Sequence, residues 1–246
     1  MSRPKVYKVL LLEDDESSAK LLLHTLERYN FDVTHVVDGM SGLTKIRNNS
    51  FDLVISDVNM PYLDGISFLE KGKDMLKMTP VIMLTAVGDK EQVRRAALSH
   101  VTAYLLKPIA NQALLEKIAQ VLQLKPENII DKKEFPLVIN VSELSISQML
   151  LEIKGCPGKK STDAIYDRFM LTLGGRATFS NLRINLDKAF FYETKALQIL
   201  DDLVAKIIKH TNIQASSLFV DSEFFNDNVV DLQPFAYLSD VNIISK

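Results

Sequence analysis

The chain has 246 residues, of which 47% are hydrophobic and 24% are charged, as is typical of globular proteins. Its net charge of -2 gives no overall basic field to attract nucleic acid or a membrane surface. A single cysteine, Cys156, excludes an internal disulfide framework, and no apolar run has the length of a membrane span. We therefore expect a cytoplasmic protein with up to two domains and no membrane contact.

Predicted strands and helices alternate from residue 5 to about residue 123. Five short segments rich in Val, Leu and Ile are expected as strands, at residues 6–12, 32–37, 51–56, 81–85 and 103–106. Helical patterns separate them, and the first carries an apolar stripe at the spacing of an amphipathic helix. A helix after each strand predicts an α/β fold with a doubly wound, five-stranded parallel sheet. Such sheets bind ligands at the carboxyl ends of their strands.

Side chains of a particular chemistry stand at those strand ends. They are Glu13, Asp14 and Asp15 after the first strand, Asp57 after the third, Thr85 at the end of the fourth and Lys107 after the fifth. Two carboxylates about 4 Å apart repel by roughly 4 kcal/mol at an effective dielectric constant of about 20, and a divalent cation relieves that cost. Oxygen ligands of this kind suit Mg²⁺.

A carboxylate beside Mg²⁺ can accept a phosphoryl group, and an ammonium and a hydroxyl group can then stabilise the transferred charge. Any one of these acids alone is better explained as a solvated loop residue. The joint arrangement favours a phosphorylation site, because each strand end supplies the side-chain type that the reaction needs.

The same motifs resemble the receiver domain of bacterial two-component response regulators. The resemblance rests on Leu11-Leu12-Glu13-Asp14-Asp15, on Asp57-Val58-Asn59-Met60-Pro61-Tyr62-Leu63-Asp64-Gly65, on Leu84-Thr85-Ala86 and on Tyr104-Leu105-Leu106-Lys107-Pro108. It covers residues 5 to about 123, so we expect a receiver domain at 1–123. It also implies a sensor histidine kinase or a phosphotransfer protein as the phosphoryl donor.

The resemblance assigns a role to each of these positions. It makes Asp57 the phosphoacceptor, Asp14 the principal Mg²⁺ carboxylate and Glu13 its partner, with the main-chain carbonyl of Asn59 completing the metal site. Asp15 is the ambiguous third acid. The resemblance further implies that Thr85 and Lys107 contact the phosphoryl group, that Tyr104 is the switch aromatic, and that the Lys107-Pro108 bond is cis.

Two departures from the family pattern lie near the last strand. His100-Val101 stands where the family usually has Gly-Ala, and Ala103 replaces the usual aspartate before the switch aromatic. Neither position belongs to the phosphorylation chemistry. Both lie near a face often used for dimerisation, so the partner geometry there stays open.

Beyond residue 123 the pattern changes. Residues 124–135 are polar and predict a linker, and 136–246 predict a smaller α+β domain. We expect a strand at 137–141, a helix from Ser142 to Gly155, a hairpin around Gly174-Gly175 with arms at 165–173 and 176–184, a helix at 188–210 and a strand at 218–220. The apolar face of helix 188–210 either covers its own sheet or meets a partner.

Three outputs are considered for this second domain. Residues 131–246 carry 13 Lys and Arg against 15 Asp and Glu, with one dense basic pair at Lys159-Lys160, which disfavours DNA binding. The run from Gly155 to Thr162 lacks the spacing of a phosphate loop, and Gly174-Gly175-Arg176-Ala177 lacks the acidic residues of a diguanylate cyclase, so an output enzyme is disfavoured as well. A protein-interaction or homodimerisation module fits best, and a phosphorylation-controlled DNA-binding regulator is the alternative.

Overall fold

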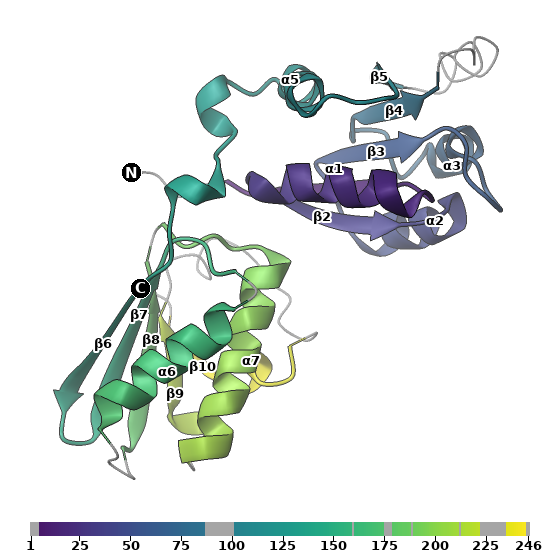
Figure 1. Ribbon diagram of the computed structural model, residues 1–246. Helices are drawn as coiled ribbons and strands as arrows, with labels where there is room; N and C mark the ends of the chain where they lie inside the picture. Colours follow the sequence, from purple (N-terminus) through teal and green to yellow (C-terminus); the bar gives the residue numbers. More distant parts are fainter. Residues whose placement is uncertain are drawn as a thin grey trace. The chain divides into compact units, whose positions relative to one another are not determined.

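The chain divides into two compact units in the computed structural model, Lys5–Asp131 and Lys132–Lys246 (Figure 1). The structure describes residues 5–86, 101–158, 160–174, 179–187, 189–211, 213–221 and 235–244. Several residues discussed above lie outside these ranges, namely His100, Lys159, Gly175, Arg176, Ala177 and Lys188. Within the described ranges, no helix has the length and apolar character that crossing a membrane requires.

The first unit contains the predicted doubly wound parallel sheet, with strands in the order β2-β1-β3-β4-β5. The strands are β1 (Tyr7–Leu12), β2 (Phe31–Val36), β3 (Leu53–Asp57), β4 (Val81–Thr85) and β5 (Ala103–Leu106). The helices are α1 (Glu16–Arg28), α2 (Gly39–Asn48), α3 (Gly65–Gly72) and α5 (Asn111–Val121). The five expected strands are confirmed to within two residues at each end.

Both faces of this sheet are covered, because successive residues of a strand point to opposite faces. On β1, Val9 and Leu11 belong to the core beneath α1 and α5, whereas Leu10 and Leu12 belong to the core beneath α2 and α3. This explains why the three central strands, β1, β3 and β4, consist largely of continuous apolar runs rather than alternating ones. In β3 and β4 the polar residues are consequently confined to the carboxyl ends, at Ser56, Asp57 and Thr85.

Part of the predicted linker is held against the first unit. A short 3-10 helix, η1 (Pro126–Asn128), leads to Asp131, whose carboxylate accepts a hydrogen bond of 2.9 Å from Nε of Arg28. Asn30 joins the same contact, since its side chain donates to the carbonyl of Asn128 and accepts from the amide of Ile130. The chain is therefore fixed to the end of α1 as far as Asp131.

The second unit is a mixed sheet with both of its described α-helices on one face (Figure 1). The strand order is β10-β9-β8-β7-β6; β6 and β7 are antiparallel and the other neighbours are parallel. The strands are β6 (Val138–Ser145), β7 (Gln148–Lys154), β8 (Asn181–Leu186), β9 (Leu218–Asp221) and β10 (Asn242–Ile244). The helices are α6 (Ser161–Leu173) and α7 (Thr194–Thr211), with 3-10 turns η2 (Lys132–Glu134), η3 (Ala215–Ser217) and η4 (Leu238–Asp240).

The expected helix from Ser142 to Gly155 is wrong, because this segment forms the second half of β6 and all of β7. Its apolar residues were interpreted with helical spacing, yet the buried ones, Met149, Leu151 and Ile153, recur at every second position. Ile146, which helical spacing would place on the same face as Met149 and Ile153, lies in the turn between the strands and is 95% exposed. A period of two is the pattern of a strand with one covered face.

The expected hairpin is wrong as well, because its first arm lies in α6. Ile165, Phe169 and Leu173 recur every four residues and are buried on one side of that helix. Gly174 has a φ of 59° and ends the helix in the left-handed conformation, so this glycine is a helix cap rather than part of a hairpin turn. The helix expected at 188–210 begins instead at Thr194, and the strand expected at 218–220 is confirmed as β9.

Asp201 joins the end of the chain to α7. This aspartate is buried, and one of its carboxylate oxygens accepts hydrogen bonds from the amides of Tyr237, at 2.8 Å, and Leu238, at 2.7 Å. Hydrogen bonds to a charged acceptor contribute more than neutral ones, and removing that acceptor leaves buried amides without it. The Asp201 carboxylate therefore helps to hold the turn before β10 against α7.

We predict that Asp201→Ala lowers the free energy of unfolding of the second unit by about 2 kcal/mol. The matched control is Asp202→Ala, which removes the exposed neighbouring carboxylate and should change stability by less than about 0.5 kcal/mol. Urea unfolding followed by circular dichroism compares the two variants. Equal effects would contradict the structural role given to Asp201.

Cys156 lies beside an ion pair formed by Lys132 and Glu193. Its thiol is 3.9 Å from Oε1 of Glu193. Burial, and then the neighbouring Glu193 carboxylate, raise the pKa of this thiol to about 11. Because only the thiolate is an effective nucleophile, Cys156 is expected to be unreactive in the folded chain.

Alkylation tests this expectation. At about pH 8, iodoacetamide should label Cys156 in the native chain roughly 100-fold or more slowly than in the urea-unfolded chain, where the thiol pKa returns to about 8.5. Mass spectrometry of quenched samples measures both rates. Native labelling as fast as unfolded labelling would show that the thiol is not protected.

Candidate functional site

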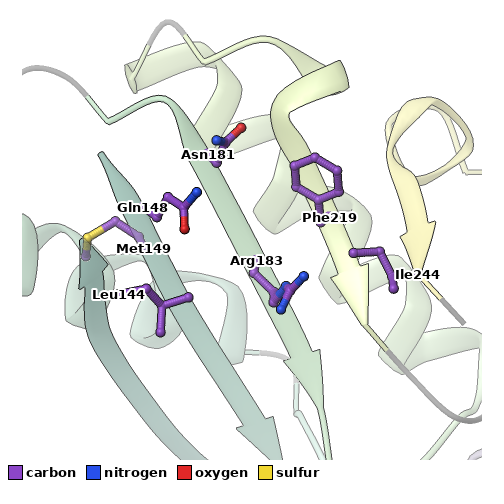
Figure 2. A pocket seen from close by; sticks show the side chains of 7 residues that line it. All are labelled: Leu144, Gln148, Met149, Asn181, Arg183, Phe219 and Ile244. Atoms are coloured by element: carbon purple, nitrogen blue, oxygen red, sulfur yellow. The ribbon is translucent and has the colours of Figure 1, made fainter. Parts of the chain in front are cut away.

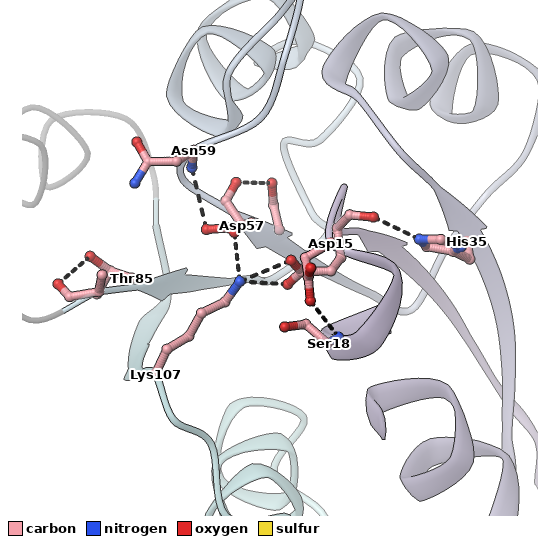
Figure 3. Close-up of polar contacts among 10 residues, drawn as sticks. Asp15, Ser18, His35, Asp57, Asn59, Thr85 and Lys107 are labelled. Carbon is pink, nitrogen blue, oxygen red and sulfur yellow. Dashed lines mark hydrogen bonds and ion pairs between the residues drawn. The ribbon is translucent and has the colours of Figure 1, made fainter. Parts of the chain in front are cut away.

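The strand register of the first unit brings the predicted site residues to one edge of the sheet. Leu12 of β1 is in register with Ser56 of β3, and Thr85 of β4 is in register with Leu106 of β5. Glu13, Asp57 and Lys107, which lie at or directly after these strand ends, consequently meet (Figure 3). Three segments far apart in the sequence thus meet at this edge, and Thr85 ends the neighbouring strand β4.

Three carboxylates form its acidic part. Glu13, Asp14 and Asp57 each offer an oxygen atom, and these atoms all lie within 4.8 Å of one another. Glu13 and Asp57 are buried, whereas Asp14 is exposed. The cluster presents only oxygen donors, which is the donor chemistry that Mg²⁺ requires. The residues present therefore fit the ion that the sequence predicts.

Asp15, the third acid of the motif, has a different partner. Its carboxylate accepts a 2.7 Å hydrogen bond from the amide of Ser18 and caps the first turn of α1 (Figure 3). That backbone hydrogen bond holds the pKa of Asp15 below its usual range. The three consecutive acids thus divide between the carboxylate cluster, which includes Glu13 and Asp14, and the helix cap.

Lys107 lies between the two buried carboxylates. Its Nζ donates to Oδ2 of Asp57 at 2.6 Å and to the two oxygens of Glu13 at 2.7 and 3.0 Å (Figure 3). Burial alone would lower the pKa of Lys107, but the hydrogen bonds and attraction of both carboxylates outweigh it and raise that pKa. One cation therefore compensates two acids in a largely dehydrated position.

Glu13 has the most dehydrated carboxylate of the cluster. Its side chain is fully buried, and this burial raises its pKa despite the opposing effect of Lys107. The ring of His35 on β2 lies 2.8 Å from the main-chain carbonyl of Glu13 (Figure 3). No role was predicted for His35 from the sequence, although it lies in the strand that was predicted at 32–37.

The loop after Asp57 is closely packed against the site. The amide of Asn59 donates to Oδ1 of Asp57 at 3.3 Å, and the hydroxyl of Ser56 donates to the main-chain carbonyl of Asp57 at 2.9 Å. A Cβ atom at Gly65 would lie 2.1 Å from that same carbonyl. Only glycine allows α3 to start this close to Asp57, a role that the sequence motif alone did not assign.

The remaining predicted residues lie on β4 and around β5. Thr85 is buried, and its hydroxyl is 3.4 Å from the carbonyl of Ala86. Tyr104 is half-buried on β5, and burial raises the pKa of its phenol. The Lys107-Pro108 peptide bond is cis, as the resemblance implies.

The second unit has a hollow on the sheet face opposite α6 and α7 (Figure 2). Its volume is about 240 Å³. Apolar and polar side chains line it together, namely Leu144, Gln148, Met149, Asn181, Arg183, Phe219 and Ile244. This hollow was not predicted from the sequence, because the strands that form it were partly interpreted as a helix and a hairpin.

Comparison with known proteins identifies the first unit. Residues 9–119 match the response regulator receiver domain. Chemotaxis protein CheY-3 of Vibrio cholerae is 31% identical over 122 residues, which are 48% of this chain and 94% of the relative. Response regulator ArlR of Staphylococcus saprophyticus is 29% identical over 150 residues, which are 57% of this chain and 67% of the relative.

Among solved structures, the chemotaxis response regulator CheY4 of Vibrio cholerae is similar at 32% identity and a TM-score of 0.45, over 48% of this chain and 99% of that one. No family match accompanies the second unit. With the receiver match and a relative that is covered almost completely, the chain belongs to the response regulators of two-component signalling, and its first unit is the receiver domain.

Proposed function

We propose that Asp57 accepts a phosphoryl group from a sensor histidine kinase or a phosphotransfer protein in the cytoplasm, and that the second unit transmits the signal to a protein partner. The observation that carries this proposal is the position of Lys107, whose ammonium contacts both Asp57 and Glu13. Such a cation can hold the nucleophile in its charged form and compensate the charge that arrives with the phosphoryl group.

In the proposed transfer, one oxygen of Asp57 forms a bond to phosphorus while the bond between phosphorus and the donor imidazole nitrogen breaks. The imidazole leaves with the electron pair of that bond. Lys107 then pairs with the phosphoryl oxygens, and the hydroxyl of Thr85 donates a hydrogen bond to them. Movement of Thr85 toward the phosphoryl group would vacate space for Tyr104, the proposed switch aromatic.

Glu13, Asp14 and Asp57, with the main-chain carbonyl of Asn59, would hold a Mg²⁺ ion. When bound, Mg²⁺ supplies positive charge that neutralises the phosphoryl oxygens. The close approach of the three carboxylates supports this assignment, because like charges at such distances are costly without a cation. The role of Asp15 as a helix cap supports Glu13 and Asp14 as the acidic pair.

For the second unit we propose protein interaction rather than DNA binding or catalysis. Its acidic residues outnumber its basic ones, which opposes an electrostatic attraction to DNA. The apolar face of α7 packs into the core of its own unit, with Leu200, Leu203 and Val204 buried. A partner would therefore meet another surface of this unit.

We predict that Asp57→Asn reduces phosphorylation by acetyl phosphate at least about 100-fold, because it removes the nucleophilic oxygen. Asp52→Asn is the matched control. It changes an aspartate just before the start of the same strand, where the carboxylate accepts from the amide of Lys8, and labelling should continue. Phosphate-affinity electrophoresis measures both variants, and wild-type labelling of Asp57→Asn would contradict the assignment.

We predict that Asp14→Asn raises the Mg²⁺ concentration needed for half-maximal phosphorylation at least about tenfold, since it removes one ligand charge. Asp15→Asn should leave this requirement unchanged, because asparagine caps a helix nearly as well as aspartate. Titrating Mg²⁺ into each variant after treatment with a chelator provides the comparison. A larger effect in Asp15→Asn would reverse the assignment of the acidic pair.

A further inference from the structure

The outer strand of the second sheet offers its backbone to a further strand. β6 spans eight residues, Val138–Ser145, and is the longest strand in the described part of the chain. It lies at one end of the strand order, and among the described residues it pairs with β7 alone. An edge strand of this length presents a row of backbone amides and carbonyls that can pair with another chain.

β6 also carries little of what normally prevents such pairing. Proteins protect their edge strands with lysine, proline, bulges or short length. β6 contains no lysine or proline, and Glu143 is its one charged residue. Its bulge lies at the far end, between Glu143 and Ser145. The opposite edge, β10, has only three residues in the described part of the chain.

The two faces of β6 differ in chemistry. Ile139 and Val141 pack against the core beneath the helices, and strand alternation places Val138 and Asn140 on the opposite face. Leu144 also belongs to that open face, because it lines the hollow beside Arg183 (Figure 2). Val138 is 45% exposed and Leu144 is 51% exposed. Both ends of the strand thus present an apolar side chain on the same open face.

We propose that β6 pairs with β6 of a second copy of this chain, antiparallel and centred on Val141. A twofold axis normal to the sheet relates antiparallel strands without exchanging their faces, so each residue meets one from the same face. Val138 then lies opposite Leu144 of the second copy, and Asn140 lies opposite Ser142. This proposal rests on the proposed function of the second unit as a protein-interaction module. It adds the identity of the partner, which is a second copy of the same chain.

The sequence of β6 favours a copy of itself over an unrelated strand. In this register Glu143 faces Ile139 of the second copy, so the one charged residue does not meet its own equivalent. Apolar side chains meet near both ends of the pairing, and cross-strand contacts of this kind stabilise antiparallel strands. The result is a continuous sheet that removes two exposed edges at once.

Two double variants of the full chain test this register. V138K/L144K places two ammonium groups opposite each other at both ends of the pairing and should weaken dimerisation at least about tenfold. V138K/L144E places an ammonium group opposite a carboxylate and should restore it. Leu171→Lys on α6, where the side chain is 73% exposed, is the matched control for adding charge to an apolar surface residue.

Sedimentation velocity over a range of concentrations gives the mass of each protein. The proposal expects twice the 27.7 kDa of one chain for the wild type, Leu171→Lys and V138K/L144E, and a shift to the single chain for V138K/L144K. A wild type that is monomeric both in the absence and in the presence of acetyl phosphate overturns the proposal. A V138K/L144K variant that is still dimeric, or a V138K/L144E variant that is monomeric, overturns it as well.

Circular dichroism and phosphorylation of the same samples distinguish a loss of dimerisation from unfolding and from a loss of phosphorylation. Native spectra in all variants exclude unfolding as the cause of a change in mass. If the wild type forms the dimer but is not phosphorylated at Asp57, the result contradicts only the proposed phosphoacceptor role. If the wild type is phosphorylated at Asp57 but is monomeric, the result contradicts only the β6 pairing.

Discussion

The contact between Lys107 and the two buried carboxylates is the interaction on which the receiver site depends. Glu13 follows β1 and Asp57 ends β3, and a parallel sheet brings those strand ends together whatever their charge. The resulting repulsion is compensated by an ammonium group at 2.6 to 3.0 Å. The same compensation keeps an oxygen of Asp57, the proposed nucleophile, close to a cation, so the stability of the edge and its proposed chemistry have one physical origin.

The receiver half was predictable because its signals are redundant. The central strands β1, β3 and β4 are buried on both faces and appear as apolar runs, and Glu13, Asp57 and Thr85 stand at or directly after their carboxyl ends. The contacts of the individual acids were harder to predict from the sequence. Glu13, Asp14 and Asp15 are adjacent in the sequence, and only their backbone geometry separates the acidic cluster from the cap of α1.

The second half was harder to predict because its apolar residues fit both the spacing of a helix and the alternation of a strand. Met149, Leu150 and Ile153 fit a helical face, whereas burial follows Met149, Leu151 and Ile153 along a strand. Gly174 serves equally well in a turn or at the end of a helix, and long-range packing of α6 decides between them. Once β6 and β7 are recognised as strands, an edge with little protection becomes visible, and this edge gives the unit a surface for association that α7 does not provide.

Chemical mapping of the phosphoryl group tests the central claim most directly. Borohydride reduces an aspartyl-phosphate to homoserine, and tandem mass spectrometry of the treated chain then locates the changed residue. Modification at Asp57, after incubation with acetyl phosphate and Mg²⁺, is the predicted result. Modification at Asp14, Asp15 or Asp52 in its place would contradict the account, because the nucleophile would then lie outside the contact made by Lys107.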